Sequence, residues 1–242
     1  MKIKWLSASL VTAMLAGCTP AKVTTQQAYM GPILAAPTRV VVTDFTIAPE
    51  RVELDQAIGA RLQRAAGNES PETLEANAAA ETQAALAQEL ARKLGSYGLN
   101  AAPLPPGSAP PPGALLVQGQ ITGINQGNRA RRVVIGLGAG RSSVTADAQL
   151  YVLSDSGTPR LLQSFHGSSD SGRMPGAVGT MGVGAAAGSL GTSAALSGGM
   201  HGVSEMHRTT DEENATRLAD ALAKQIGDFA AAQGWIAAAA VQ

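Results

Sequence analysis

Large apolar side chains are confined to a few short periodic segments of this 242-residue chain, and their distribution constrains the fold more than any other feature. Hydrophobic residues make up 45% of the chain, but aromatic residues make up only 3%. Forty-five alanines and 28 glycines account for much of the composition. A core built from these residues is lean, which favours a small domain with low-complexity segments over one compact enzyme of this length.

Four segments have the pattern of β-strands. Residues 143–153 alternate between apolar and polar side chains, as a half-buried strand does. Residues 114–124 and 160–166 are further strand candidates, and the β-branched segment 39–47 predicts a buried strand. The turn residues 155–159 join two of these strands into a predicted hairpin.

Two further segments have the period of long helices. The first helix is predicted to start at Pro71, after Ser70 as its N-cap. The second is predicted to start at a capping box of Thr210 and Glu213 and to end at Gly234. The apolar stripes of the two helices are Leu86, Leu90, Leu94 and Tyr97 in the first, and Ala215, Leu218, Leu222, Ile226 and Phe229 in the second.

A shorter helix is expected within residues 50–66, with Val52, Ile58 and Leu62 on one side. The predicted order is then strand, helices, strand, hairpin and helix. This order indicates an α+β domain, with a small mixed or antiparallel sheet and helices packed on one face, plus Gly-rich and Pro-rich loops.

The N-terminal segment has the pattern of a secretory signal. Lys2 and Lys4 precede an apolar stretch that is too short to span a bilayer as a helix. Residues 15–18, Leu-Ala-Gly-Cys, resemble the bacterial lipobox, and Cys18 is the only cysteine of the chain. That resemblance implies cleavage before Cys18, a diacylglycerol thioether on its sulfur and an acylated (palmitate-type) amine. An ordinary cleaved signal with an incidental cysteine is the alternative.

These features predict the domain organisation. Residues 1–17 are the expected lipoprotein signal peptide, 18–37 a lipid-anchored flexible tether, and 38–236 an α+β periplasmic domain. The Pro-rich loop 103–113 and the Gly-rich insertion 167–207 are expected to lie outside its core. Thr19, and not Asp, follows Cys18. By resemblance to the sorting of enterobacterial lipoproteins, this implies lipid-anchored delivery to the bacterial outer membrane, facing the periplasm.

Residues 127–144 begin Gly-Asn-Arg-Ala-Arg-Arg and continue through a Gly-x-Gly-x-Gly run. They resemble the signature of an uncharacterised family of bacterial lipoproteins that carry a domain of unknown function. Residues 39–46, 90–100 and 114–121 resemble, more loosely, the periplasmic domain of curli-secretion lipoproteins and of lipoprotein activators of cell-wall synthases. This looser resemblance implies assembly and protein contact without catalysis. The chain lacks the membrane-spanning strands expected of a curli-type pore, so the pore function is not carried over.

The run of Gly136, Gly138 and Gly140 is a predicted strained turn between strands. A dinucleotide-binding Gly-x-Gly-x-x-Gly motif that begins at Gly136 would need its third glycine at position 141, where Arg141 stands. It would also need a helix directly after that glycine. Four arginines flank the turn and are candidates for contact with an anionic partner or headgroup, or else form a solvated loop with paired charges. They are Arg129, Arg131, Arg132 and Arg141.

Residues 174–204 contain no Asp, Glu, Lys or Arg. Gly184 and Gly188 form a short small-xxx-small pattern that permits close backbone approach, so they are candidates for self-association. The alternative is a loop without such a role.

Charge and composition exclude several functional classes. The 18 basic and 18 acidic residues cancel, which argues against a nucleic-acid partner. One cysteine and three histidines without ligand spacing predict no metal site, and we expect no cofactor. His166 near Ser168, Ser169 and Asp170 lacks the nucleophile-elbow pattern of a hydrolase. The leading hypothesis is a non-enzymatic envelope lipoprotein, anchored to the membrane and contacting an envelope protein or its own copies. The alternative is a small-ligand or glycan-binding module that uses the Arg-flanked glycine loop.

Overall fold

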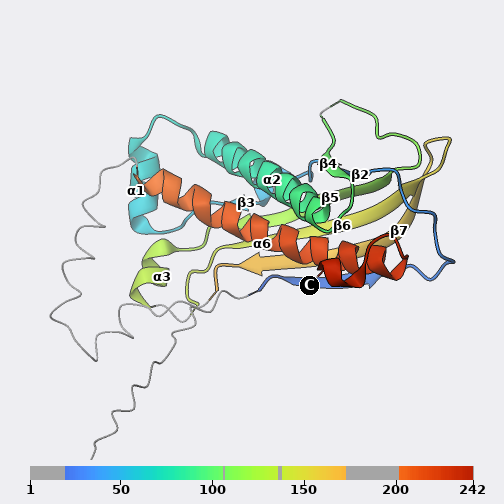
Figure 1. Cartoon of the computed structure of the whole chain (residues 1–242). Helices are drawn as coiled ribbons and strands as arrows, with labels where there is room; N and C mark the ends of the chain where they lie inside the picture. Colours follow the sequence, from blue (N-terminus) through green and yellow to red (C-terminus); the bar gives the residue numbers. More distant parts are fainter. Residues whose placement is uncertain (1–19, 106, 136–137, 173–201, 242) are drawn as a thin grey trace, which may run out of the picture.

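The structure of the protein is a computed structural model that describes residues 20–105, 107–135, 138–172 and 202–241. The described residues form an α+β domain with one mixed, open sheet, which confirms the predicted fold class. Figure 1 shows two long helices lying together across one face of the sheet.

The sheet has seven strands in the order β1-β7-β6-β5-β2-β4, with β3 beside β5. Strands β5, β6, β7 and β1 pair antiparallel, whereas β2 pairs parallel with β4 and β5, and β3 pairs parallel with β5. The strand bounds are β1 Lys22–Gln27, β2 Val40–Val42, β3 Val52–Glu53, β4 Ala101–Pro103, β5 Leu115–Asn125, β6 Ser143–Leu153 and β7 Pro159–Asp170. The predicted hairpin is confirmed as β6 and β7.

The helices are α1 Ile58–Ala66, α2 Pro71–Ser96, α3 Arg129–Val134 and α6 Gly202–Ala232, with 3-10 turns η1 Pro49–Arg51 and η2 Ala238–Val241. Helix α2 starts as predicted, because the Ser70 hydroxyl accepts a hydrogen bond from the Thr73 amide at 3.3 Å and Pro71 follows the cap. Helix α6 ends before Gly234, whose φ of 76° suits glycine.

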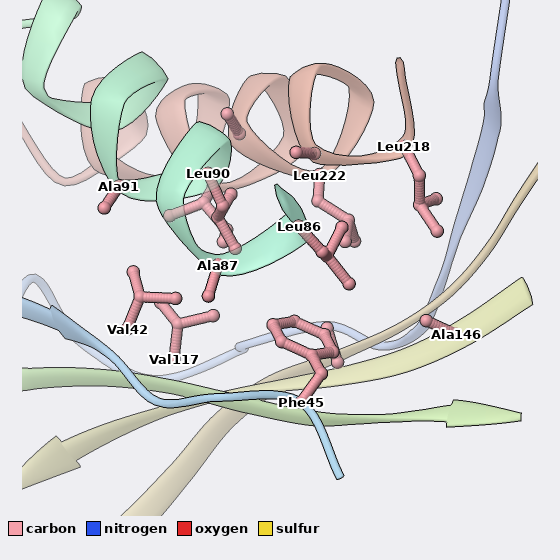
Figure 2. Close-up of a cluster of buried hydrophobic side chains, with 14 of the residues drawn as sticks. Val42, Phe45, Leu86, Ala87, Leu90, Ala91, Val117, Ala146, Leu218 and Leu222 are labelled. Atoms are coloured by element: carbon pink, nitrogen blue, oxygen red, sulfur yellow. The ribbon is translucent and has the colours of Figure 1, made fainter. Parts of the chain in front are cut away.

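The core lies between the sheet and the helix pair α2–α6. The predicted stripes of both helices are buried, and they pack on the inward side chains of β2, β5, β6 and β7. Figure 2 shows Phe45 beneath Leu86, beside Val42 and Val117. Gly119 leaves room for the Phe45 ring, since a Cβ there would overlap the ring. Small residues therefore let a lean core close tightly.

The prediction of a flexible tether over 18–37 is wrong for much of that segment. Residues 22–27 form β1, which pairs with β7. The Tyr29 ring packs edge-on against Phe229 with centroids 6.0 Å apart, and the Leu34 carbonyl accepts a hydrogen bond from the Trp235 indole at 3.0 Å. An edge strand with mostly exposed side chains has no apolar periodicity, so its sequence gives little sign of it.

Other boundaries also differ from the predictions. The 50–66 region contains η1, β3 and α1 instead of one helix, and Ile58 and Leu62 of α1 are exposed. Thr210 lies within α6 and is not its N-cap, since the helix begins at Gly202. Strand β7 continues to Asp170, so the predicted insertion 167–207 overlaps strand and helix at its two ends.

Candidate functional site

One end of the domain collects most of the residues that the sequence singled out. At this end β5 stops at Asn125, which pairs with Ser143 at the start of β6, and Ser143 pairs with Asp170 at the end of β7. The register of β1 pairs Lys22 with Ser168, so β1 begins there as well. Figure 1 shows α1 and α3 beyond this end of the sheet. We call it the arginine end: α1, residues 126–135 with α3, residues 138–142, and the adjoining strand ends.

The loop of residues 126–142 is closed by contact between its own two ends. The Asn128 amide donates to the Gly140 carbonyl at 3.0 Å. Gly127 and Gly140 have φ of 73° and 72°, and a Cβ on either would overlap the backbone of the opposite side of the loop. The Asn128 side chain accepts from the Arg131 amide at 3.0 Å and so caps α3. Gly127 and Gly140 thus allow the two sides of the loop to approach each other closely.

The predicted glycine turn is therefore seen in part. Gly138 and Gly140 both adopt positive φ, in agreement with a strained turn, whereas Gly136 lies outside the described residues. The sequence did not predict α3 between Gly127 and this turn. The Asn128 cap was the available signal for it.

A buried polar cluster joins the loop to α1 and α6. Asp55 is 1% exposed, and its Oδ1 accepts from the Ala57 amide at 2.8 Å and the Arg129 amide at 3.4 Å. The Gln126 side chain accepts from the Asp55 amide at 3.2 Å and donates to Asp211 at 3.0 Å. Because these contacts cross three elements, they fix the position of the loop on the domain.

The four predicted arginines reach the same end but do not form one site. Arg132 is directed inward, where its guanidinium donates to the Gln126 carbonyl at 3.3 Å. Burial lowers the pKa of Arg132, and the carboxylates of Asp55 and Asp211 counteract this effect. Arg141 is paired with Asp170 at 3.3 Å.

Arg131 is exposed, and Arg129 is half-buried, with its amide on Asp55. Arg132 and Arg141 thus make contacts within the domain, whereas the side chain of Arg131 on α3 is exposed.

Exposed aliphatic side chains at the arginine end were not predicted. Val133, Val134 and Ile135 are each at least half exposed, and Ile58 and Leu62 are 76% and 65% exposed. Neither α1 nor α3 contains a buried residue. The helical spacing of Ile58 and Leu62 was recognised in the sequence, but not the absence of a partner for it.

The His166 region does not assemble as a hydrolase site. His166 contacts Asp147 at 2.7 Å on the exposed face of the sheet, opposite the face that α2 and α6 cover. Ser169 faces inward, where it is 2% exposed and donates to Asn214 at 3.5 Å. The alternation of side chains along β7 therefore separates His166 from Ser169.

A small hollow lies between α2 and α6, lined by Ala78, Glu81, Thr82, Gln126, Asp211 and Glu212. Its empty volume of about 190 Å³ includes space open to solvent. The described part of the chain contains no cluster of three potential metal ligands. Within the same residues, no helix is long and apolar enough to cross a membrane. Cys18, Gly184 and Gly188 lie outside the described residues.

The fold and this end define a small α+β domain with one covered sheet face, one open sheet face and an arginine-rich end. The chain belongs to the family described as a domain of unknown function, DUF4410, which matches residues 40–188. This match confirms the expectation of an uncharacterised family.

Two solved structures are distantly similar to the chain. A PelC dodecamer from Paraburkholderia phytofirmans is 12% identical with a TM-score of 0.32, and the match covers 81% of this chain and 98% of that one. A PelC variant dodecamer from the same organism is 13% identical with a TM-score of 0.30, covering 82% and 98%. No curated protein matches the chain.

Proposed function

We propose that the protein is an acyl-anchored lipoprotein of the bacterial outer membrane, and that its α+β domain is a non-enzymatic interaction or assembly module facing the periplasm. The observation that carries this proposal is the position of Cys18. It is the only cysteine of the chain and it ends the Leu-Ala-Gly-Cys segment after a short apolar stretch. In proteins with this pattern the cysteine sulfur takes a diacylglycerol group, and cleavage frees the cysteine amine for a further acyl chain.

The start of β1 gives this anchor a structural consequence. Only three residues separate Cys18 from Lys22, the first residue of β1. A fully extended chain advances by at most about 3.6 Å per residue, so Cys18 lies within about 14 Å of Lys22. An acyl chain on Cys18 would therefore hold the domain directly on the membrane surface instead of at the end of a long tether.

The open face of the sheet offers a surface for a protein partner or a second copy. Toward the arginine end of this face, the outward side chains of β5, β6 and β7 are polar and include Gln120, Asp147 and His166. Toward the other end, Leu116 and Tyr151 belong to a small apolar cluster with Val41 and Leu153. Polar side chains of this kind can form the hydrogen bonds and hold the bridging waters that are typical of protein–protein interfaces. This surface supports the interaction role within the proposal.

The alternative, a small-ligand or glycan module built on the glycine loop, has no observation in its favour among the described residues. The backbones at Gly127 and Gly140 pack against the opposite side of the loop. Arg132 is directed inward, and Arg141 is paired with Asp170. A loop closed on itself in this way leaves little backbone for a ligand.

Metabolic labelling tests the proposal. Cells that express the chain are fed a labelled fatty acid, and membranes are then washed with salt. We expect the wild-type protein to take up label and to stay in the membrane fraction. Cys18→Ser should lose all label, because a hydroxyl does not replace the thiol in thioether formation. Thr19→Ser is the matched control and should keep it. An unlabelled wild-type protein that salt removes from membranes would refute the anchor.

A further inference from the structure

Helices α1 and α3 are the two elements of the described domain that carry large aliphatic side chains without burying them. Leu62 and Ile58 lie one helical turn apart on α1, so their side chains share one face. On α3 and the residue after it, Val133, Val134 and Ile135 are all exposed. Burying such side chains is favourable by about 25 cal/mol per Å² of apolar surface, so an exposed group of them indicates a contact made outside the domain.

The charges of the same two helices are all positive. Arg61 and Arg64 lie on α1, and Arg129, Arg131 and Arg132 lie on α3. Neither helix contains an aspartate or a glutamate. Helix α3 contributes exposed aliphatic side chains and Arg131 without a single apolar face. Helix α1 has Ile58 and Leu62 on one face with Arg61 beside them, which is the pattern of a helix that lies in a membrane interface. Its arginines can pair with phosphate groups while its aliphatic side chains enter the acyl boundary.

The pairing of β1 places both helices on the anchor side of the domain. Strand β1 starts at the end of the sheet beyond which α1 and α3 lie (Figure 1). Residues 18–21 lead to Lys22 at that end, so an anchor at Cys18 lies within about 14 Å of it. The short connection and the two helices with exposed aliphatic side chains therefore lie at the same end of the domain.

We propose that α1 and α3 dock on the anionic phospholipid surface to which Cys18 is anchored. This inference rests on the proposed function for the anchor. Ile58, Leu62, Val133, Val134 and Ile135 enter the interface, and Arg61 and Arg131 contact lipid phosphates. The domain then has a fixed orientation, with the β6–β7 turn of residues 154–158 directed away from the bilayer. The acyl chains alone suffice for stable attachment, so the docking of α1 and α3 adds a defined orientation of the domain to that attachment.

A depth measurement tests the docking without depending on acylation in cells. A chain from Cys18 to Gln242, which keeps every described residue, is coupled through the Cys18 thiol to a maleimide lipid in vesicles. An environment-sensitive fluorescent amino acid replaces Leu62, Val134 or Asp155, one position at a time. Asp155 is exposed at the opposite end of β6 and β7 and is the matched control position. Lipids with nitroxide groups in their acyl chains report contact by quenching.

In vesicles that contain phosphatidylglycerol, we expect a blue shift and strong quenching at positions 62 and 134, and neither at 155. Arg61→Glu with Arg131→Glu should reduce quenching at 62 and 134 several-fold, whereas Arg39→Glu, at the opposite end of the sheet, should not. Added salt should weaken the contact, because surface charges are screened.

Quenching at 155 equal to that at 62, or equal quenching in pure phosphatidylcholine, would overturn the docking. A concentration-dependent blue shift at 62 without vesicles would assign the surface to a second copy instead. Because the lipid is attached chemically, these results do not depend on whether cells acylate Cys18. Failure of labelling in cells would therefore count against the anchor alone.

Discussion

Two residues, Gly127 and Gly140, hold the loop of residues 126–142 closed. Each combines a positive φ with a position where a Cβ would overlap backbone atoms. The chain also offers Gly157, whose φ of 79° is similar but whose Cβ would meet no atom within 4 Å. Alanine substitution at Gly140 and at Gly157 therefore separates the cost of backbone conformation from the cost of steric overlap.

Gly140→Ala should lower the free energy of unfolding by about 2–4 kcal/mol, because it adds a collision to the strained backbone. Gly157→Ala should cost only about 1 kcal/mol, since only the conformational cost applies. Chemical denaturation of both variants measures the difference. Equal losses would contradict the close approach of the two backbones.

Asp220 of α6 has a raised pKa, mainly because of burial, with nearby Glu89 adding to the rise and Lys93 opposing it. A carboxyl whose pKa is higher in the folded state is penalised while it is ionised, that is, above its folded pKa. Asp220→Asn should therefore stabilise the protein at neutral pH.

The gain from Asp220→Asn should be below about 1 kcal/mol, because the side chain is partly exposed. It should shrink as the pH falls through the raised pKa and vanish below about 3.9, the ordinary value. Melting temperatures at several pH values measure this, with Asp228→Asn as a control in the exposed pair with Lys224. A gain that persists at low pH would contradict the assignment to ionisation.

Apolar periodicity predicted the helices and strands that bury one face in the core, and it missed those that do not. Strand β6 and helix α2 alternate or repeat apolar residues because one face of each is buried, so their sequences reveal them. Strand β1 is an edge strand with the sequence Lys-Val-Thr-Thr-Gln-Gln, and its backbone pairing leaves no apolar pattern. Helix α3 depends on the Asn128 cap and on contacts with Asp55, which lies far from it in the sequence.

The pairing of β1 can be measured by hydrogen exchange. In an antiparallel edge strand, alternate amides point to the neighbouring strand and the others point to solvent. We therefore expect about half of the amides in residues 22–27 to be protected and the others to exchange rapidly. Uniformly rapid exchange across these residues would restore the tether that the sequence predicted.

At the scale of the whole molecule, the anchor, the short connection and the α1 and α3 surface form one arrangement. Each of the three features is inferred from a different observation. The anchor follows from a sequence motif, the short connection from the register of β1, and the docking surface from the exposure of side chains on α1 and α3. The sequence could predict the first but not how the second and third meet, because that depends on strand order.

Lengthening the connection tests this arrangement. An insertion of about ten Gly and Ser residues after Pro20 should leave the melting temperature unchanged, since the fold begins at β1. The insertion should weaken quenching at position 62 in the vesicle assay, because a longer linker lowers the local concentration of the docking surface at the bilayer. Unchanged quenching would mean that docking does not depend on the short connection.

Acylation of Cys18 is tested most directly by the mass of the N-terminal peptide from protein purified out of membranes. We predict a peptide that begins at Cys18, with a diacylglyceryl group on sulfur and an acyl group on the new amine. A peptide that contains unmodified Cys18, or an N-terminus at another residue, would contradict lipid anchoring through Cys18.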